Sequence, residues 1–292
     1  MKGSSYIKSK QTLWAKRKNI ALIGSQGAKG FPAYTQTLEE NLFEPMNSSV
    51  FGDISKGDGG ELKGNNNSSA KMKAVHSSSA IGVNLFHYWK TNGKIDNIAH
   101  ACRLCAKQNK TQTDIRFEQK FPISKAFQIH PKIDVVIENN DEAQYKVFAI
   151  ECKFSEAYSK RTDGKKGFDP KYFNNDILPL WKDIPNLNIL AKTISPIDNE
   201  FKFLDSSQLI KHILGLKNKY GKKSFRLLYL WYDVLGEEGH EHRKEIERFT
   251  EYTKVDNVKF SAISYQEVIT FLADNYYDSN EKYIDYITDR YL

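Results

Sequence analysis

Apolar residues recur at every second position in two neighbouring segments, 133–139 and 145–154. This period of two is typical of β-strands, and the polar residues between the segments are typical of a turn. Segment 115–121 has a similar pattern. Segment 224–234 is almost continuously apolar, as expected for a strand that is buried on both faces. A short apolar segment at 258–262 completes the predicted strands.

Apolar residues three and four positions apart predict α-helices around these strands. Ser78 or Ser79 can cap the first helix. Asp205 or Ser206 can cap a later helix, which ends at Gly221. The expected helices are 79–89, 95–107, 206–220, 237–253, 264–275 and 280–292. Strands separated by long helices predict an α/β fold with a mixed central sheet.

The first part of the chain differs in composition from the rest. Residues 1–30 are basic and contain no acid. Residues 52–79 are rich in Gly, Asn, Ser, Lys and Asp, which is typical of a surface loop or a disordered linker. Residues 1–76 are therefore predicted to form a basic N-terminal arm and flexible linker, and residues 77–292 to form the folded domain.

The charge balance favours an anionic partner. The 292 residues carry a net charge of +7, and the sequence pI is about 9.0. The basic N-terminus can follow a phosphate backbone, or it can be a solvated tail. A second basic cluster lies nearer the C-terminus and consists of Lys211, Lys217, Lys219, Lys222, Lys223 and Arg226.

Composition also bears on the compartment. No run of 18 apolar residues is present, so no membrane span is expected, and the basic, polar N-terminus does not resemble a secretory signal. The three cysteines, Cys102, Cys105 and Cys152, form an odd set that fits a reducing cytoplasm better than a disulfide framework. Cys102 and Cys105 follow His100, but no second Cys/His pair completes a zinc site.

Two charged residues, Glu151 and Lys153, interrupt the apolar strand 145–154. Side chains two positions apart share a face of a strand, about 6.5–7 Å apart. If Asp134 of the preceding strand lies beside Glu151, two carboxylates converge next to one ammonium. Such a group can bind a hard divalent cation, and the lysine can position or activate a water for attack on a phosphodiester. A surface row of ion pairs is the alternative interpretation.

The acid-x-lysine pattern itself is common in this chain, in which 27% of the residues are charged. It starts at Glu61, Glu118, Glu151, Asp163, Asp169 and Glu200. Only Glu118 and Glu151 lie in strand-like sequence, and only Glu151 follows a strand that carries an acid shortly after a proline. This context favours the catalytic interpretation for Glu151.

The segments HPKIDVVIEN (130–139) and FAIECKF (148–154) resemble the core of the PD-(D/E)XK nuclease superfamily. Segments 77–89 and 208–234 look similar to its bacterial restriction-endonuclease-like branch. The resemblance covers residues 77–292. It implies a restriction-endonuclease-like α/β core, in which helices flank a mixed central β-sheet.

The resemblance also implies roles for individual residues. Asp134 and Glu151 would bind Mg²⁺, for which Mn²⁺ could substitute, and the backbone carbonyl of Cys152 would be a further metal ligand. Lys153 would orient or help to deprotonate the attacking water. These four positions match the short diagnostic motif of the superfamily.

Three further residues are candidates for lesser roles. Many relatives carry an acid on the helix before the first core strand, but segment 77–89 has none. Glu118 is therefore a candidate third acid, with an exposed pair to Lys120 as the alternative. The exonuclease branch has a Gln followed four residues later by Tyr near its active site. Here Gln208 is followed by His212, and both are expected on one polar face of a capped helix.

These features predict a metal-dependent DNA endonuclease of restriction or defence type. One alternative is a catalytically inactive nucleic-acid-binding protein on the same fold. Another is an α/β hydrolase that acts on a substrate other than nucleic acid. Cleavage of both DNA strands needs two active sites or two successive nicks, so a homodimer is expected.

Overall fold

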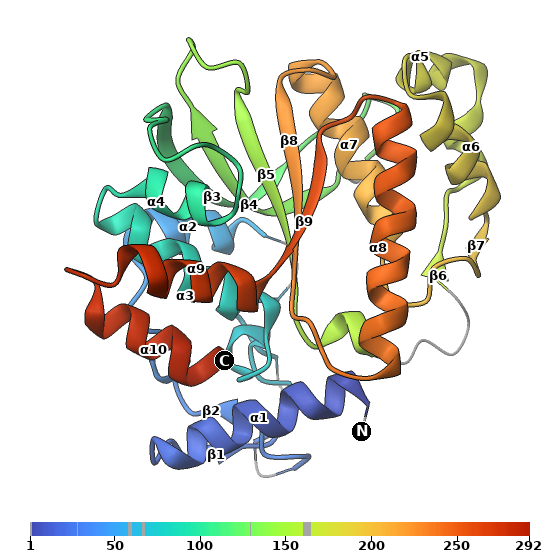
Figure 1. Ribbon diagram of the computed structural model, residues 1–292. Coiled ribbons are helices and arrows are strands. Elements are labelled where there is room, and N and C mark those ends of the chain that lie inside the picture. The colour runs from blue at the N-terminus through green and yellow to red at the C-terminus, as the bar shows by residue number, and fades with distance from the viewer. Residues whose placement is uncertain (1, 28, 58–59, 66–67, 129, 160–164) are drawn as a thin grey trace.

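A five-stranded mixed sheet forms the centre of the molecule (Figure 1). The computed structural model describes residues 2–292 except 28, 58–59, 66–67, 129 and 160–164. The strands are β3 (Gln112–Lys120), β4 (Lys132–Asn139), β5 (Val147–Lys153), β8 (Phe225–Trp231) and β9 (Phe260–Ser264), in the spatial order β3-β4-β5-β8-β9. β3, β4 and β5 are antiparallel, whereas β5, β8 and β9 are parallel. The expected α/β fold with a mixed central sheet is confirmed.

The burial of the two central strands follows from their sequences. In β5 every residue except Lys153 is buried, and in β8 every residue except Arg226 is buried. Apolar side chains on both faces of a strand need cover on both sides, which is why these two strands lie inside the sheet and not at its edge. A charged side chain in such a strand, such as Glu151, therefore needs polar partners in the protein interior.

Helices cover both faces of the sheet. α3 (Ser78–Thr91) packs on the face to which Cys152 points, since a Cβ atom added at Gly82 would lie 3.6 Å from the Cys152 Sγ. α7 (Ser206–Tyr220) lies on the opposite face, because its His212 contacts Glu151, whose side chain alternates with that of Cys152. On the α3 side lie α4 (Ile95–Ala101), α9 (Tyr265–Tyr276) and α10 (Glu281–Tyr291), and on the α7 side lies α8 (Glu237–Val255) (Figure 1).

The structure has further helices and two small sheets. They are α1 (Gly3–Arg17), α2 (Ser48–Ser55), α5 (Leu178–Trp181), α6 (Pro185–Thr193) and the small two-stranded sheets of β1 (Leu22–Ile23) with β2 (Tyr34–Thr35) and of β6 (Lys165–Lys166) with β7 (Ile197–Asp198). The helix expected over 95–107 ends at Ala101, and Arg103 takes a left-handed conformation (φ 56°) that helical backbone does not allow. In the described residues no helix is both long and apolar enough to cross a bilayer.

The N-terminal segment, expected to be an arm and linker, packs on the C-terminal helix. α1 lies along α10 (Figure 1), and the buried Arg290 of α10 joins the two. The Arg290 guanidinium donates hydrogen bonds to the Gln11 Oε1 (3.1 Å) and to the Asn41 carbonyl (2.8 Å). The Gln11 Nε2 in turn donates to the Arg290 carbonyl (3.0 Å). Gln11 and Asn41 of the N-terminal segment therefore form hydrogen bonds with α10.

The basic composition of this segment did not predict this packing, because one face of α1 is buried and the other is exposed and basic. Ile7, Gln11 and Trp14 are buried at helical spacing, while basic residues such as Lys16 and Arg17 are exposed. α2 docks separately on β3, where the buried Asp53 carboxylate binds the Arg116 guanidinium at two points, 2.9 and 2.8 Å. Bidentate pairs of this kind fix orientation as well as contact.

Replacing Gln11 by Ala tests whether α1 is part of the folded unit. The change removes both hydrogen bonds with Arg290 and leaves buried polar groups unpaired, so we expect the free energy of unfolding to fall by about 1–3 kcal/mol. Chemical denaturation measures this, with Leu13→Ala on the exposed side of the same helix as the control. Equal stability of the two variants would show that α1 is the loose arm that its composition suggests.

Candidate active site

Three acids lie in one row across the sheet. Phe117 of β3 is opposite Val135 of β4, and Val135 is opposite Ile150 of β5. The next position on each strand therefore places Glu118 beside Asp134 and Asp134 beside Glu151. Sequence alone predicted the Asp134–Glu151 neighbours, and Glu118 joins them because β3 pairs with β4 in the matching register.

The strands separate at this row. The pairing of β4 with β5 runs from Glu138 and Val147 to Val135 and Ile150. Beyond it the Cys152 N–H donates to the Asp134 Oδ2 (2.7 Å) and not to a backbone carbonyl of β4. The Lys153 carbonyl accepts from Tyr232 on the β8 side, so the Cys152 carbonyl, one residue earlier, points to the β4 side. A carboxylate and a strand carbonyl thus face the same opening.

Glu151 is fully buried, with an ammonium at one carboxylate oxygen and an imidazole at the other. Its Oε1 forms an ion pair with the Lys153 Nζ at 2.6 Å, and its Oε2 lies 2.8 Å from the His212 Nε2. The Lys153 Nζ also donates to the Gln208 Oε1 (2.9 Å). Burial alone would raise the pKa of Glu151, but Lys153 and His212 outweigh it and lower this pKa to about 2. Glu151 is therefore an anion at neutral pH.

The polar face predicted for α7 is turned to this site. Gln208 and His212 are one helical turn apart, and each binds one member of the Glu151–Lys153 pair. Their spacing was the available signal in the sequence, but it could not show whether the face meets solvent or the sheet. His212 is buried, which identifies the contact as internal.

The remaining charges at the site repel one another. Burial raises the pKa of Asp134 well above its ordinary value, and the Glu151 and Glu118 carboxylates raise it further. Burial also raises the pKa of Glu118, to about 7, with repulsion from Glu61 and Glu151 adding to the shift. Lys153 opposes the pKa shift of Asp134, and Lys132 and Lys153 oppose that of Glu118. The site holds more carboxylates than ammonium groups, which is the electrostatic condition that favours a divalent cation.

Glu118 itself has strained backbone. Its φ of 51° lies in the left-handed region, which is uncommon for residues other than Gly, Asn and Asp. The side chain direction at this residue therefore does not follow the alternation of the strand. Its carboxylate lies near Gly57, since a Cβ atom added there would be 3.7 Å from the Glu118 Oε2. Such outliers cluster at functional sites, where surrounding structure holds them.

Sequence reasoning missed one acid close to the lysine. Glu156 follows β5, and its Oε1 accepts a hydrogen bond from the Phe154 N–H (3.2 Å). Its charge contributes, after those of Glu151 and Asp134, to raising the pKa of Lys153 against the opposing effect of burial. Because its pKa is raised, Lys153 is an ammonium at neutral pH. No sequence pattern predicted Glu156, because it lies in an irregular segment after the strand.

The donor atoms fit a magnesium ion in kind. The Asp134 and Glu151 carboxylates and the Cys152 carbonyl are hard oxygen donors. The Glu151 Oε1 is buried, and its partner is the Lys153 ammonium at 2.6 Å. Within the described residues no group of three or more His, Cys, Asp or Glu side chains is close enough to hold a metal. A metal here would rely on two acids, one backbone carbonyl and water.

His242 of α8 has a structural role. Its side chain is fully buried. Its Nε2 lies 3.0 Å from the Tyr229 hydroxyl, and its Nδ1 lies 3.2 Å from the Tyr158 hydroxyl. His242 therefore joins α8 to the sheet.

The mixed sheet, its helical cover and the acids at the strand opening define a restriction-endonuclease-like α/β protein. The family model described as "Restriction Endonuclease associating with ARP" matches residues 8–292. The chain therefore belongs to this restriction-endonuclease family. Comparison with curated proteins and with solved structures gives no significant match.

Metal binding should depend on the acids and not on the lysine. Asp134→Ala and Glu151→Ala each remove a hard oxygen donor, so we expect binding of Mg²⁺ or Mn²⁺ to collapse. Lys153→Ala should bind metal as well as the wild type or slightly better, because an ammonium ligates nothing and repels cations. Calorimetric titration measures all three, with Glu200→Ala, an exposed acid paired with Arg248, as the control. Equal affinity across the set would exclude this site.

The raised pKa of Glu118 predicts a pH dependence of the metal-free protein. Between the ordinary value of 4.5 and about 7, the folded state holds a proton that the unfolded chain has released. Stability should therefore fall as the pH rises through this window. In EDTA we expect Glu118→Gln to be more stable than wild type above pH 7, by on the order of 1–3 kcal/mol, and similar to it near pH 4.5.

Chemical denaturation across this pH range decides the point, with Glu200→Gln as the matched surface control. A difference between Glu118→Gln and wild type that does not change with pH would contradict the raised pKa.

Proposed function

We propose that this protein is a Mg²⁺-dependent DNA endonuclease of the PD-(D/E)XK type that acts in restriction or defence. The observation that carries the proposal is the opening between β4 and β5, where Asp134, the Cys152 carbonyl and the buried Glu151–Lys153 pair meet. Family membership supports the nuclease assignment and a DNA substrate. Magnesium and the PD-(D/E)XK type rest on the donor chemistry and on the sequence motif.

Different residues of the site would bind the metal and orient its ligands. Asp134, Glu151 and the Cys152 carbonyl would hold the metal, and Glu118 would assist from the neighbouring strand. The chemistry that a bound Mg²⁺ supplies is polarisation of the scissile phosphate and activation of the attacking water. His212 fixes the orientation of the Glu151 carboxylate from its second oxygen.

Lys153 would orient the attacking water and stabilise the charge that develops on the phosphate. Its pKa is raised, so it stays protonated at neutral pH and donates hydrogen bonds instead of removing a proton. Gln208 and Glu151 hold the ammonium from two sides, which limits its movement. Preorganised donors of this kind are effective because they need little rearrangement during the reaction.

One observation favours a second candidate, an inactive nucleic-acid-binding protein on the same fold. Both oxygens of Glu151 already have partners, Lys153 and His212, so the carboxylate is satisfied without a metal. Metal titration separates the two candidates. Binding of Mg²⁺ that depends on Asp134 and Glu151 supports the enzyme.

The cysteines bear on the cellular compartment of the protein, and the proposed activity bears on its oligomeric state. Cys102, Cys105 and Cys152 are all free, which supports a reducing compartment, and we infer the cytoplasm. A homodimer would provide the second active site that double-strand cleavage requires.

Plasmid nicking tests the proposed activity. Wild type should nick DNA with Mg²⁺ and not with EDTA, and Asp134→Ala, Glu151→Ala and Lys153→Ala should each lose on the order of 10²–10³ in rate. DNA binding should survive in all three, because these groups act on the transition state. Filter binding beside the nicking assay measures both properties.

Glu200→Ala is again the matched control, since Glu200 also begins an acid-x-lysine pattern. We would abandon this mechanism if Lys153→Ala cleaved at the wild-type rate, or if Glu200→Ala lost as much activity as Glu151→Ala.

A further inference from the structure

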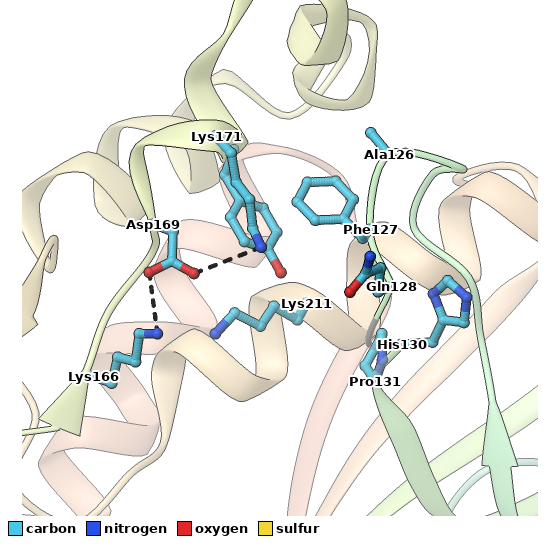
Figure 2. Close-up of a pocket in the computed structure, with 10 residues that line it drawn as sticks. Ala126, Phe127, Gln128, His130, Pro131, Lys166, Asp169, Lys171 and Lys211 are labelled. Carbon is cyan, nitrogen blue, oxygen red and sulfur yellow. Dashed lines mark ion pairs between the residues drawn. The ribbon is translucent and has the colours of Figure 1, made fainter.

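A concave basic pocket lies beside the candidate active site. It has a volume of about 420 Å³, which is in the range of sites for small ligands. One wall is the connection between β3 and β4, including Phe127 and Gln128, and the other is the segment after β6, including Asp169 and Tyr172. Figure 2 shows Lys211 of α7 extending between these two walls. We refer to this cavity as the lysine pocket.

Positive charge exceeds negative charge in the lysine pocket. Lys166, Lys171 and Lys211 line it, and Asp169 is the carboxylate among its lining residues. Asp169 lies 3.1 Å from the Lys166 Nζ and 3.8 Å from the Lys171 Nζ, so one anion is shared by two cations (Figure 2). Cationic groups in a concave site with apolar walls attract anions more strongly than the same groups on a flat surface.

Lys211 differs from Lys217 and Lys222, two other lysines of its basic cluster. Lys217 donates to the Leu180 carbonyl, and Lys222 donates to the Asp183 carbonyl. The Lys211 Nζ instead lies over aromatic rings, 4.9 Å from the Phe168 centroid, and no ion pair joins it to another described residue. Burial lowers the pKa of Lys211, which an anion in the pocket would reverse. Its ammonium is the group in the pocket with most to gain from a ligand.

The lysine pocket and the candidate active site share their framework. Lys211 is adjacent to His212, which contacts Glu151, so α7 serves both sites. Pro131, another lining residue, is three residues before Asp134, or about 10 Å along an extended strand. Nucleotides of one DNA strand follow each other every 3.4 Å or so along the duplex axis. A strand whose phosphate is at Asp134 would therefore place another phosphate near the pocket within about three nucleotides.

We propose that the lysine pocket binds a phosphate group of a nucleotide, and that in the working enzyme this nucleotide belongs to the DNA strand beside the scissile bond. Only the origin of the phosphate rests on the proposed function. The recognition chemistry, three ammonium groups and one carboxylate that two of them share, also fits the phosphate of a free mononucleotide.

Two variants with opposite expected effects test the proposal. Lys166→Ala/Lys171→Ala/Lys211→Ala removes the cations, and we expect duplex DNA to bind about tenfold more weakly or worse. The salt dependence should become shallower by about 0.9 for each phosphate that the variant no longer neutralises. Asp169→Asn removes the competing anion and should tighten binding. A loss of folding cannot produce this gain, so the second variant keeps the test decisive if the triple variant folds poorly.

The control is a second lysine-lined cavity, of about 280 Å³, at the end of α8. Lys254→Ala/Lys259→Ala removes its cations and should leave DNA binding nearly unchanged. The inference is overturned if this pair and the triple variant weaken binding equally, or if neither the triple variant nor Asp169→Asn changes it.

A second arm uses deoxyadenosine 5′-monophosphate, with calorimetry of wild type and both pocket variants. Nicking by wild type reports on the proposed function separately. If wild type neither binds nor nicks DNA, the proposed function fails, and mononucleotide binding that disappears in the triple variant would still support a phosphate site. Absence of pocket-dependent binding in both arms would overturn the inference even if wild type nicks DNA.

Discussion

The burial of the Glu151 carboxylate is the constraint on which the centre of this structure depends. An ionised carboxylate inside a sheet costs several kcal/mol unless it is paired and hydrogen-bonded. Lys153 and His212 meet that cost at the two oxygens, and Gln208 secures the lysine. Since Gln208 and His212 both lie on α7, satisfying this charge also fixes the helix on the sheet. Electrostatics and packing are thus settled by the same contacts.

Where β4 separates from β5, backbone and side-chain oxygens beside Glu151 become accessible to a ligand. In a fully paired sheet the Cys152 N–H and carbonyl would both be used by β4, and no ligand could reach them. Asp134 satisfies the N–H with its side chain, which leaves the carbonyl and the second carboxylate oxygen available for other partners. A metal pocket between two strands therefore needs an acid at this position, one that replaces a backbone acceptor and still retains a free oxygen.

Local pattern predicted the parts of this structure that depend on neighbours in sequence. The period of two placed Asp134 and Glu151 on adjacent strands, and register then brought them together. The contacts of Gln208 and His212 depend on how α7 lies on the sheet, which no local pattern encodes. The packing of α1 on α10 depends on tertiary contacts in the same way, because the basic composition of residues 1–30 averages over a helix whose buried face meets α10.

The central claim is that a divalent ion binds where β4 and β5 separate. Anomalous diffraction from crystals soaked in Mn²⁺ tests it most directly, because the signal locates the ion without reference to activity. The account predicts one anomalous peak bounded by the Asp134 and Glu151 carboxylates and the Cys152 carbonyl, with Lys153 beside it. A peak elsewhere, or no peak at this opening when Mn²⁺ is saturating, would contradict it.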